Sequence, residues 1–420
     1  MNSLSRCIVL SAICSFLVAL SLSSASGQDE PTLPEDDKCI TCHVDSELMP
    51  EGLSNTDVHL SPGLSCAGCH GGDPTTDDEE IAMSPEAGFV GVPARHEIST
   101  FCGKCHSDID FMRQYQPRIP TDQVAQYATS VHGKRLAAGD GKVADCTSCH
   151  TSHAILPAKD TRSTVHALNV PTTCDQCHGD SDYMSNYGIP TDQFKKFAKG
   201  VHGVALLENH DTGAPACNDC HGNHGATPPG VTSVGQVCGH CHVNNMQYFQ
   251  ASPMAAAFEE HEFVGCEECH GNHDIVKTHD DMVGTGDQSV CVDCHEEGDS
   301  GWEAAKSIRT HLRTLVDKYD EALAKQDEVQ RFGMDDEEIE FLLQEAHQSL
   351  IQSRTLVHTF DPEKVGERTG EGLVKASSAL EIAFDQIKEY DVRRRGFGLA
   401  TLFITLLVVA LFFKIRQMEA

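Results

Sequence analysis

Hydrophobic residues are distributed unevenly along the 420-residue chain, and their pattern predicts how the chain is organised. An apolar run at residues 7–22 follows a segment with one basic residue and precedes several small residues, which is typical of a secretory signal peptide. A second, uncharged apolar run at residues 396–413 is long enough to cross a bilayer as a helix. We therefore expect a signal peptide at 1–27, a transmembrane helix at 396–413 and a cytoplasmic tail at 414–420.

Between residues 301 and 395, apolar residues recur every three or four positions, as they do on one face of a helix. Three such stripes comprise Ile308, Leu312, Leu315, Tyr319 and Leu323; Ile339, Leu343, Ala346, Leu350 and Val357; and Leu373, Leu380, Phe384 and Ile387. Gly333 is typical of a helix end, and Asp361 before a proline is typical of a helix start. The pattern predicts a helical hairpin or three-helix bundle whose last helix continues into the membrane, and the bundle is equally suited to a dimer interface.

Residues 28–300 contain eighteen of the 20 cysteines, and the other two, Cys7 and Cys14, lie in the signal peptide. All eighteen form C-x-x-C pairs, and a histidine follows each pair directly. In chain order, sites 1 to 9 are Cys39, Cys42 and His43; Cys66, Cys69 and His70; Cys102, Cys105 and His106; Cys146, Cys149 and His150; Cys174, Cys177 and His178; Cys217, Cys220 and His221; Cys238, Cys241 and His242; Cys266, Cys269 and His270; and Cys291, Cys294 and His295.

C-x-x-C-H is the attachment motif of haem c. The two thiols form thioethers with the porphyrin vinyl groups, and the imidazole of the histidine becomes the proximal ligand of the iron. Disulfide scaffolds, zinc knuckles and thioredoxin-like pairs do not explain a histidine after every second cysteine. The motifs therefore predict nine covalently attached haem c groups.

An internal repeat arranges these sites in pairs. Residues 118–133 match residues 188–203 with a period of 70, and shorter variants occupy 39–70 and 238–273. Ten further histidines recur at set places relative to the sites and are candidates for the second axial ligand: His59, His132, His202 and His261; His153, His224 and His273; His96, His166 and His279. Mostly bis-histidine ligation is expected, but the sequence leaves open which histidine binds which iron.

The five other histidines are weaker candidates for iron ligands. His210 and His240 fit none of the three recurring positions and are expected at the surface. His311, His347 and His358 lie among the helical stripes, where residues usually pack into a core.

The array from Cys39 to His295 offers only about 29 residues for each site, too few for a conventional hydrophobic core. We expect a mainly α fold with much irregular structure at 28–300, in which the porphyrins supply the core, followed by the helical bundle at 301–395. With 63 acidic and 31 basic residues the formal charge is −32, which argues against binding nucleic acid.

The paired C-x-x-C-H sites, the distal histidine of "SVHG" (130–133) and the "CHGNH" strings (220–224 and 269–273) resemble the periplasmic multihaem cytochromes of class III, the doubled-CxxCH family. A signal peptide and membrane helix around such a body also resemble the cytochrome subunits of quinol-oxidising membrane complexes. The resemblance implies bis-histidine electron carriers on the periplasmic face of a bacterial inner membrane. Redox proteins or a quinol-oxidising complex are the implied partners.

Two functions remain open on the sequence alone. One is an electron-transfer protein, which we favour because every attachment site ends in histidine. The other is a multihaem reductase or oxidase of small nitrogen or sulfur compounds, which requires one haem with an open axial position.

Overall fold

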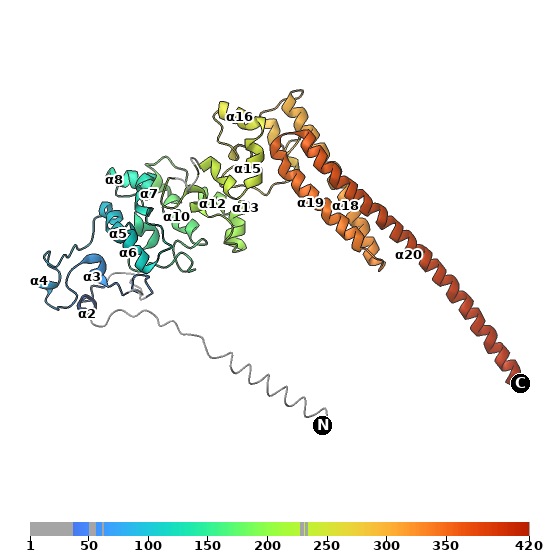
Figure 1. The fold of residues 1–420 in the computed structure, drawn as a ribbon, viewed down its shortest axis with the longest axis horizontal. Helices are drawn as coiled ribbons and strands as arrows, with labels where there is room; N and C mark the ends of the chain where they lie inside the picture. Colours follow the sequence, from blue (N-terminus) through green and yellow to red (C-terminus); the bar gives the residue numbers. More distant parts are fainter. Residues whose placement is uncertain (1–36, 50–55, 61–62, 227–230, 232–233, 420) are drawn as a thin grey trace. The chain divides into compact units, whose positions relative to one another are not determined.

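The computed structural model describes residues 37–49, 56–60, 63–226, 231 and 234–419, so the expected signal peptide lies outside the described residues. Within them every regular element is helical, and irregular segments connect the short helices that precede residue 300 (Figure 1). The predicted class, mainly α with much irregular structure, is confirmed.

The short elements carry the attachment motifs and the turns between them. In order they are α2 (Lys38–Asp45), α3 (Cys66–His70), α4 (Glu79–Ala82), η1 (Arg95–Glu97), α5 (Ile98–His106), α6 (Ile109–Tyr115), α7 (Gln123–Thr129), α8 (Val131–Ala137), α9 (Cys146–His150), α10 (Val170–His178), α11 (Ser181–Met184), α12 (Gln193–Phe197), α13 (Val201–Gly203), η2 (Val204–Glu208), α14 (Cys217–His221), η3 (Val234–His240), α15 (Val243–Gln250), α16 (Pro253–Glu260), α17 (Glu267–His270), η4 (Asp280–Met282) and η5 (Val290–Asp293). The longer C-terminal part comprises α18 (Ser300–Arg331), α19 (Glu337–Leu356), η6 (Val357–Thr359) and α20 (Pro362–Glu419).

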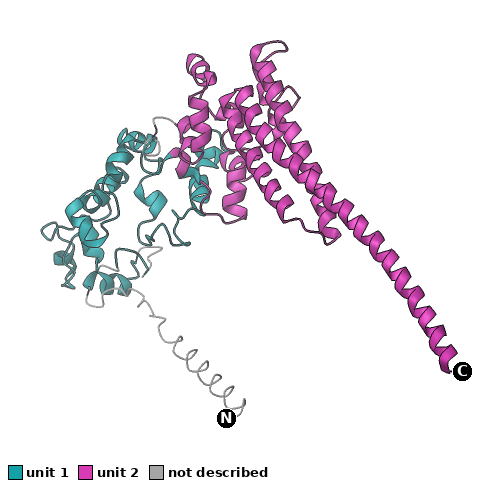
Figure 2. Cartoon of the chain, turned by 45° about the vertical axis from the view of Figure 1, so that its right-hand side comes forward, with its two compact units in different colours: residues 1–191, 216–218, 222–226 teal, residues 192–215, 219–221, 227–420 magenta. Residues whose placement is uncertain are grey.

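The chain divides into two compact units (Figure 2). Unit 1 comprises residues 1–191, 216–218 and 222–226, and it contains sites 1 to 5. Unit 2 comprises residues 192–215, 219–221 and 227–420, and it contains sites 7 to 9 together with α18, α19 and α20. The residues of α14, which carries site 6, are shared between the two units. The long helices therefore form one compact unit with the last attachment sites.

Each long repeat positions its distal histidine with a tight helix–helix turn. Ser130 ends α7 and starts α8, where its hydroxyl accepts a hydrogen bond from the backbone N–H of Gly133 at 3.0 Å. A Cβ atom on Gly133 would lie 2.0 Å from the Tyr127 carbonyl oxygen, and one on Gly203 would lie 1.9 Å from that of Phe197. Only glycine allows so close an approach, which explains the "VHG" sequence in both repeats.

The three long helices pack together as the predicted bundle. One cluster comprises Ile308, Leu312, Leu315, Leu350 and Val365, and a second comprises Ala322, Val329, Ile339, Leu343, Ala379, Leu380 and Ala383. A Cβ atom on Gly372 would lie 2.8 Å from Ser349 Cβ, so glycine at this position lets α20 approach α19 closely. Leu323 and Phe384 were expected in the stripes but are 39% and 48% exposed, because small residues such as Ala379 and Ala383 form the α20 contact face instead.

The apolar run at 396–413 is part of α20, a helix of 58 residues. Among the described residues, α20 is the one helix long and apolar enough to cross a membrane, and its apolar window is not buried by the protein. Phe397 and Phe403 are 75% and 70% exposed. An exposed apolar surface of this extent is suited to a membrane anchor.

Candidate haem-binding sites

Each C-x-x-C-H motif lies on or at the end of one helical turn. Sites 2, 4 and 6 coincide with α3, α9 and α14, and sites 3 and 5 form the last turns of α5 and α10. Helical spacing places the two thiols of a motif on one side of the turn and the histidine beside them. Among the described residues, none of the eighteen cysteines forms a disulfide. The arrangement fits two thioether bonds to one porphyrin edge.

The second cysteines of the motifs differ in burial and in where they lie relative to a helix. Cys42 lies inside α2 and is half-buried, and its carbonyl oxygen accepts the backbone N–H of Ser46 at 2.9 Å. Cys241 lies just beyond the end of η3 and is exposed, and its N–H donates to the Cys238 carbonyl oxygen at 3.3 Å. Cys294 likewise lies just beyond the end of η5 and is exposed, and Cys69 is exposed within α3. Haem attachment through the individual cysteines stays a prediction.

Neighbouring sites lie against each other in chain order. Within the repeats, hydrogen bonds join the first thiols of two sites: Cys102 with Cys146, Cys174 with Cys217, and Cys238 with Cys266. Between repeats, the second cysteine of one site lies near a cysteine of the next site. The pairs are Cys69 and Cys105, Cys149 and Cys174, Cys220 with Cys238 and Cys241, and Cys269 and Cys291. The sites therefore follow one another as a continuous series within each unit.

Burial keeps four of the thiols protonated. It raises the pKa of Cys39, Cys149, Cys220 and Cys269 to about 11 in each case, with nearby cysteine and carboxyl groups adding to the effect. At neutral pH these side chains are uncharged, so thioether formation at these positions requires no buried thiolate to be neutralised.

Seven of the nine proximal histidines face a second histidine across a nearly constant gap. The distances between ring centres are 6.0 Å for His106–His59, 6.4 Å for His70–His153, 6.1 Å for His178–His132, 6.1 Å for His150–His224, 6.3 Å for His242–His202, 5.9 Å for His221–His273 and 6.1 Å for His270–His358. Each pair lies within one compact unit.

This spacing fits a metal between the rings. Two imidazole nitrogens each about 2.0 Å from one iron, with about 1.2 Å from each nitrogen to its ring centre, place the ring centres about 6 Å apart. Ordinary aromatic pairs have ring centres about 4.5–7 Å apart, so the spacing indicates a metal because it recurs at seven attachment histidines. The residues present therefore fit bis-histidine haem at these seven sites.

The pairs follow a rule that crosses from one repeat to the next. The histidine before the second site of a repeat faces the first site of the following repeat, as His132 faces His178 and His202 faces His242. The histidine three residues after a second site faces the second site of the preceding repeat, as His224 faces His150. The repeats are thus linked in both directions by their ligands.

Hydrogen bonds at Nδ1 orient several of these rings. Nδ1 of His70 lies 2.7 Å from the Gly91 carbonyl oxygen, and that of His358 lies 3.0 Å from the Thr355 oxygen. The His59 ring instead contacts the Asp57 carboxylate at 2.9 Å. A partner at Nδ1 leaves Nε2 available for iron and fixes the plane of the ring.

Burial also sets the protonation state of the facing histidines. It lowers the pKa of ten of them below the ordinary histidine value: His106, His132, His150, His153, His202, His221, His224, His270, His273 and His358. Neutral imidazole is the form that binds a metal. These side chains are therefore in the ligating state at neutral pH.

The structure does not bring every expected ligand to a proximal histidine. Among the described residues, no second imidazole faces His43 or His295 at this spacing. His96, His261 and His279 are exposed. His166 is buried, and its Nδ1 accepts a hydrogen bond from the backbone N–H of Leu168 at 3.3 Å.

One facing histidine was missed by sequence reasoning. His358 lies in η6, between two long helices, and was expected to pack in the bundle, yet its ring faces His270 of site 8. The sequence contains no second site after site 9, and so no histidine three residues after such a site that could face site 8. The cross-repeat rule leaves site 8 without a second ligand from the array, so one must come from elsewhere.

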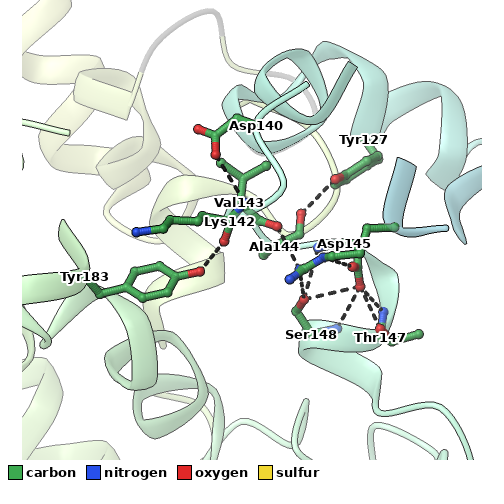
Figure 3. A network of polar contacts seen from close by, with 10 residues as sticks. Tyr127, Asp140, Lys142, Val143, Ala144, Asp145, Thr147, Ser148 and Tyr183 are labelled. Atoms are coloured by element: carbon green, nitrogen blue, oxygen red, sulfur yellow. Dashed lines mark hydrogen bonds and ion pairs between the residues drawn. The ribbon is translucent and has the colours of Figure 1, made fainter. Parts of the chain in front are cut away.

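A polar network holds the loop that leads into site 4 (Figure 3). Asp145 is buried and caps α9, accepting hydrogen bonds from the backbone N–H groups of Thr147 at 2.9 Å and Ser148 at 3.1 Å. Nε of Arg95 donates to the same carboxylate at 3.0 Å. Burial would raise the pKa of Asp145, but these hydrogen bonds and the Arg95 charge lower it below its ordinary value. The loop is therefore fixed by an ionised carboxylate.

Comparison with protein families agrees with this geometry. Residues 58–179, which span sites 2 to 5, match the family model for cytochrome c3. Residues 19–71 match the model for cytochrome c554 and c-prime. The chain is therefore a multihaem c-type cytochrome, an electron-transfer protein with covalently bound haem c, and the expected resemblance to such cytochromes is confirmed. Neither curated proteins nor solved structures gave a match.

Proposed function

We propose that this chain is a membrane-anchored periplasmic cytochrome with nine haems, which conducts electrons between a quinol-linked donor in the membrane and periplasmic acceptors. The observation that carries the proposal is the set of seven facing imidazole pairs at 5.9–6.4 Å. An iron with two imidazole ligands has no free position for a substrate, so these sites are suited to electron transfer alone.

The order of the sites supports conduction through the body. A cysteine of each site lies near a cysteine of the next, so cofactors bound to the sites are close neighbours. Acidic residues outnumber basic ones two to one, which stabilises the more positive oxidised iron and steers basic redox partners to the surface.

The apolar part of α20 supports a location at the membrane, where a quinol-oxidising complex would be the donor. A single helix offers little surface for a quinol pocket, so we favour a partner complex over direct quinol oxidation. The bundle is also a candidate surface for homo-oligomer formation.

The test uses the full-length holoprotein reconstituted in liposomes. Intact mass should exceed that of the mature polypeptide by nine haem groups. Reduction by a soluble quinol analogue should be slow alone and fast with a quinol-oxidising membrane fraction, and inhibitors of that fraction should abolish the fast phase. Rapid reduction by quinol without the fraction would contradict the need for a partner.

The alternative function is reduction or oxidation of a small nitrogen or sulfur compound, and few of the nine sites are suited to it. The seven paired sites are closed to substrate, so this chemistry would be confined to site 1 or site 9. A high-spin haem that binds nitrite or sulfite and turns it over would favour the enzyme, whereas nine low-spin haems would exclude it.

A further inference from the structure

The fourth repeat, at residues 238–273, has a methionine where the two long repeats have their distal histidine. Residues 126–133, 196–203 and 248–255 read "QYATSVHG", "KFAKGVHG" and "YFQASPMA". Aligned on the aromatic residue in second place, Met254 takes the position of His132 and His202.

The backbone supports this alignment. The helix preceding each turn ends in the same way, because the N–H groups of Ser130, Gly200 and Ser252 all donate to the carbonyl oxygen three residues earlier at 3.0 Å. The following helix begins at the next residue in all three repeats, with proline at the first position of α16. Met254 is therefore the second residue of its helix, as each of the two histidines is.

Packing after the turn is also equivalent. The residue four positions further on is buried in all three repeats: Leu136, Leu206 and Phe258 are 4%, 0% and 9% exposed. The repeats differ at Ala255, which stands where the two long repeats have the glycine of the tight turn. The side chain before it still leaves the helix on the same face, because the buried position anchors that face.

Site 9 stands in the same relation to the fourth repeat as sites 5 and 7 do to the repeats before them. Cys149 lies near Cys174 and Cys177 of site 5, and Cys220 lies near both cysteines of site 7. In the same way, Cys269 lies near both cysteines of site 9. Sites 5 and 7 receive His132 and His202, so the equivalent position, Met254, belongs to site 9.

His261, the histidine of the fourth repeat, does not take this place. It lies seven residues beyond Met254 at the end of α16, which is about 10 Å along a helix. It is exposed, and its ring contacts Phe263 with ring centres 5.8 Å apart.

We propose that the thioether sulfur of Met254 is the second axial ligand of the haem c attached at Cys291 and Cys294, opposite His295. The inference rests on the proposed occupation of all nine sites. Histidine–methionine ligation raises the potential of a haem above that of bis-histidine haems. Site 9 is then the most oxidising position of the array.

The test compares variants of the full-length holoprotein, each first shown by intact mass to carry nine haems. A lower mass would contradict the nine-haem proposal, and ligation is judged only on fully loaded protein. The oxidised wild type should show the far-red charge-transfer band of histidine–methionine haem. Met254→Ala should lose this band and gain one high-spin haem that binds carbon monoxide when reduced. Met254→His should also lose the band but stay low-spin, and its highest-potential component should move down among the others.

Two controls separate Met254 from its neighbours. Met282→Leu alters another buried methionine in unit 2, and His261→Ala removes the competing histidine; both should keep the band. A wild type without the band, a band that survives in Met254→Ala, or a high-spin haem created by His261→Ala would overturn the assignment.

Discussion

The Asp57 carboxylate is expected to lower the potential of the haem at site 3, and Asp57→Asn should raise it. Asp57 Oδ1 lies 2.9 Å from Nδ1 of His59, the histidine that faces His106. Adding about 2.2 Å across the ring and about 2.0 Å from Nε2 to iron places the negative charge about 7 Å from the metal. The Asp57 side chain is only 7% exposed, so water screens it weakly from that side.

The magnitude follows from Coulomb's law. Two unit charges about 7 Å apart interact by about 2.4 kcal/mol at an effective dielectric constant of about 20. The His59 side chain is 30% exposed, and solvent there reduces the interaction to about 1–2 kcal/mol. Because about 1.4 kcal/mol corresponds to about 59 mV for one electron, the potential should rise by roughly 40–90 mV.

The assay can distinguish site 3 from the other sites. The rings of His59 and His106 lie at 85° to each other, whereas the other six pairs lie between 5° and 54°. Perpendicular imidazoles leave the two π-bonding iron orbitals close in energy, so site 3 should give a low-spin EPR signal at unusually low field. A redox titration monitored on that signal measures its potential directly.

The matched control is Asp110→Asn, which removes a carboxylate four residues after His106 that is 88% exposed. Solvent screens such a charge, so the control should shift the potential by much less. If Asp57→Asn and Asp110→Asn shift the low-field signal equally, or if Asp57→Asn lowers its potential, the electrostatic reasoning is wrong.

Three further predictions concern ligation and stability. His358→Ala should convert one haem to a high-spin form that binds carbon monoxide, whereas His347→Ala, whose ring contacts Tyr319 instead, should leave the spin state unchanged. Asp145→Ala should lower the free energy of unfolding by about 2–3 kcal/mol at pH 7, because buried donors lose their acceptor. The folded-state pKa of Asp145 is lowered, so this contribution is present above the unfolded value of about 3.9 and is lost as pH falls below it; denaturant titrations at pH 7 and pH 3 should show the difference between wild type and variant shrinking. Leu315→Ala should destabilise the bundle by about 2–5 kcal/mol, and equal thermal stability of variant and wild type would contradict the packing described above.

The attachment motifs and the helical bundle could be predicted because both depend on short-range patterns. A C-x-x-C-H motif is complete within five residues, and Leu312 and Leu315 follow a helical period. The start of α20 at Asp361 also depends on local sequence, because the Asp361 carboxylate accepts a hydrogen bond from the backbone N–H of Glu363 at 3.0 Å. Such features need no knowledge of which segments meet.

The pairing of histidines could not be predicted because it depends on contacts between repeats. His132 lies nearer in sequence to site 4 than to site 5, yet it faces His178 of site 5. The rule becomes visible only when several pairs are seen together. The ligand position of His358 could not be predicted for another reason. A single histidine among helical stripes has the same local pattern as a residue that packs in a core.

The position of His358 links the candidate membrane helix α20 to the attachment sites. Its ring faces the last paired site, its Nδ1 is held by Thr355, and α20 begins at Pro362, four residues later. The helix that continues into the apolar run therefore starts beside a candidate iron ligand. Anything that tilts or unfolds the bundle also displaces that ligand, because η6 connects α19 to α20 directly. We therefore expect loss of bundle stability to appear as altered ligation at site 8 before the rest of the array is affected.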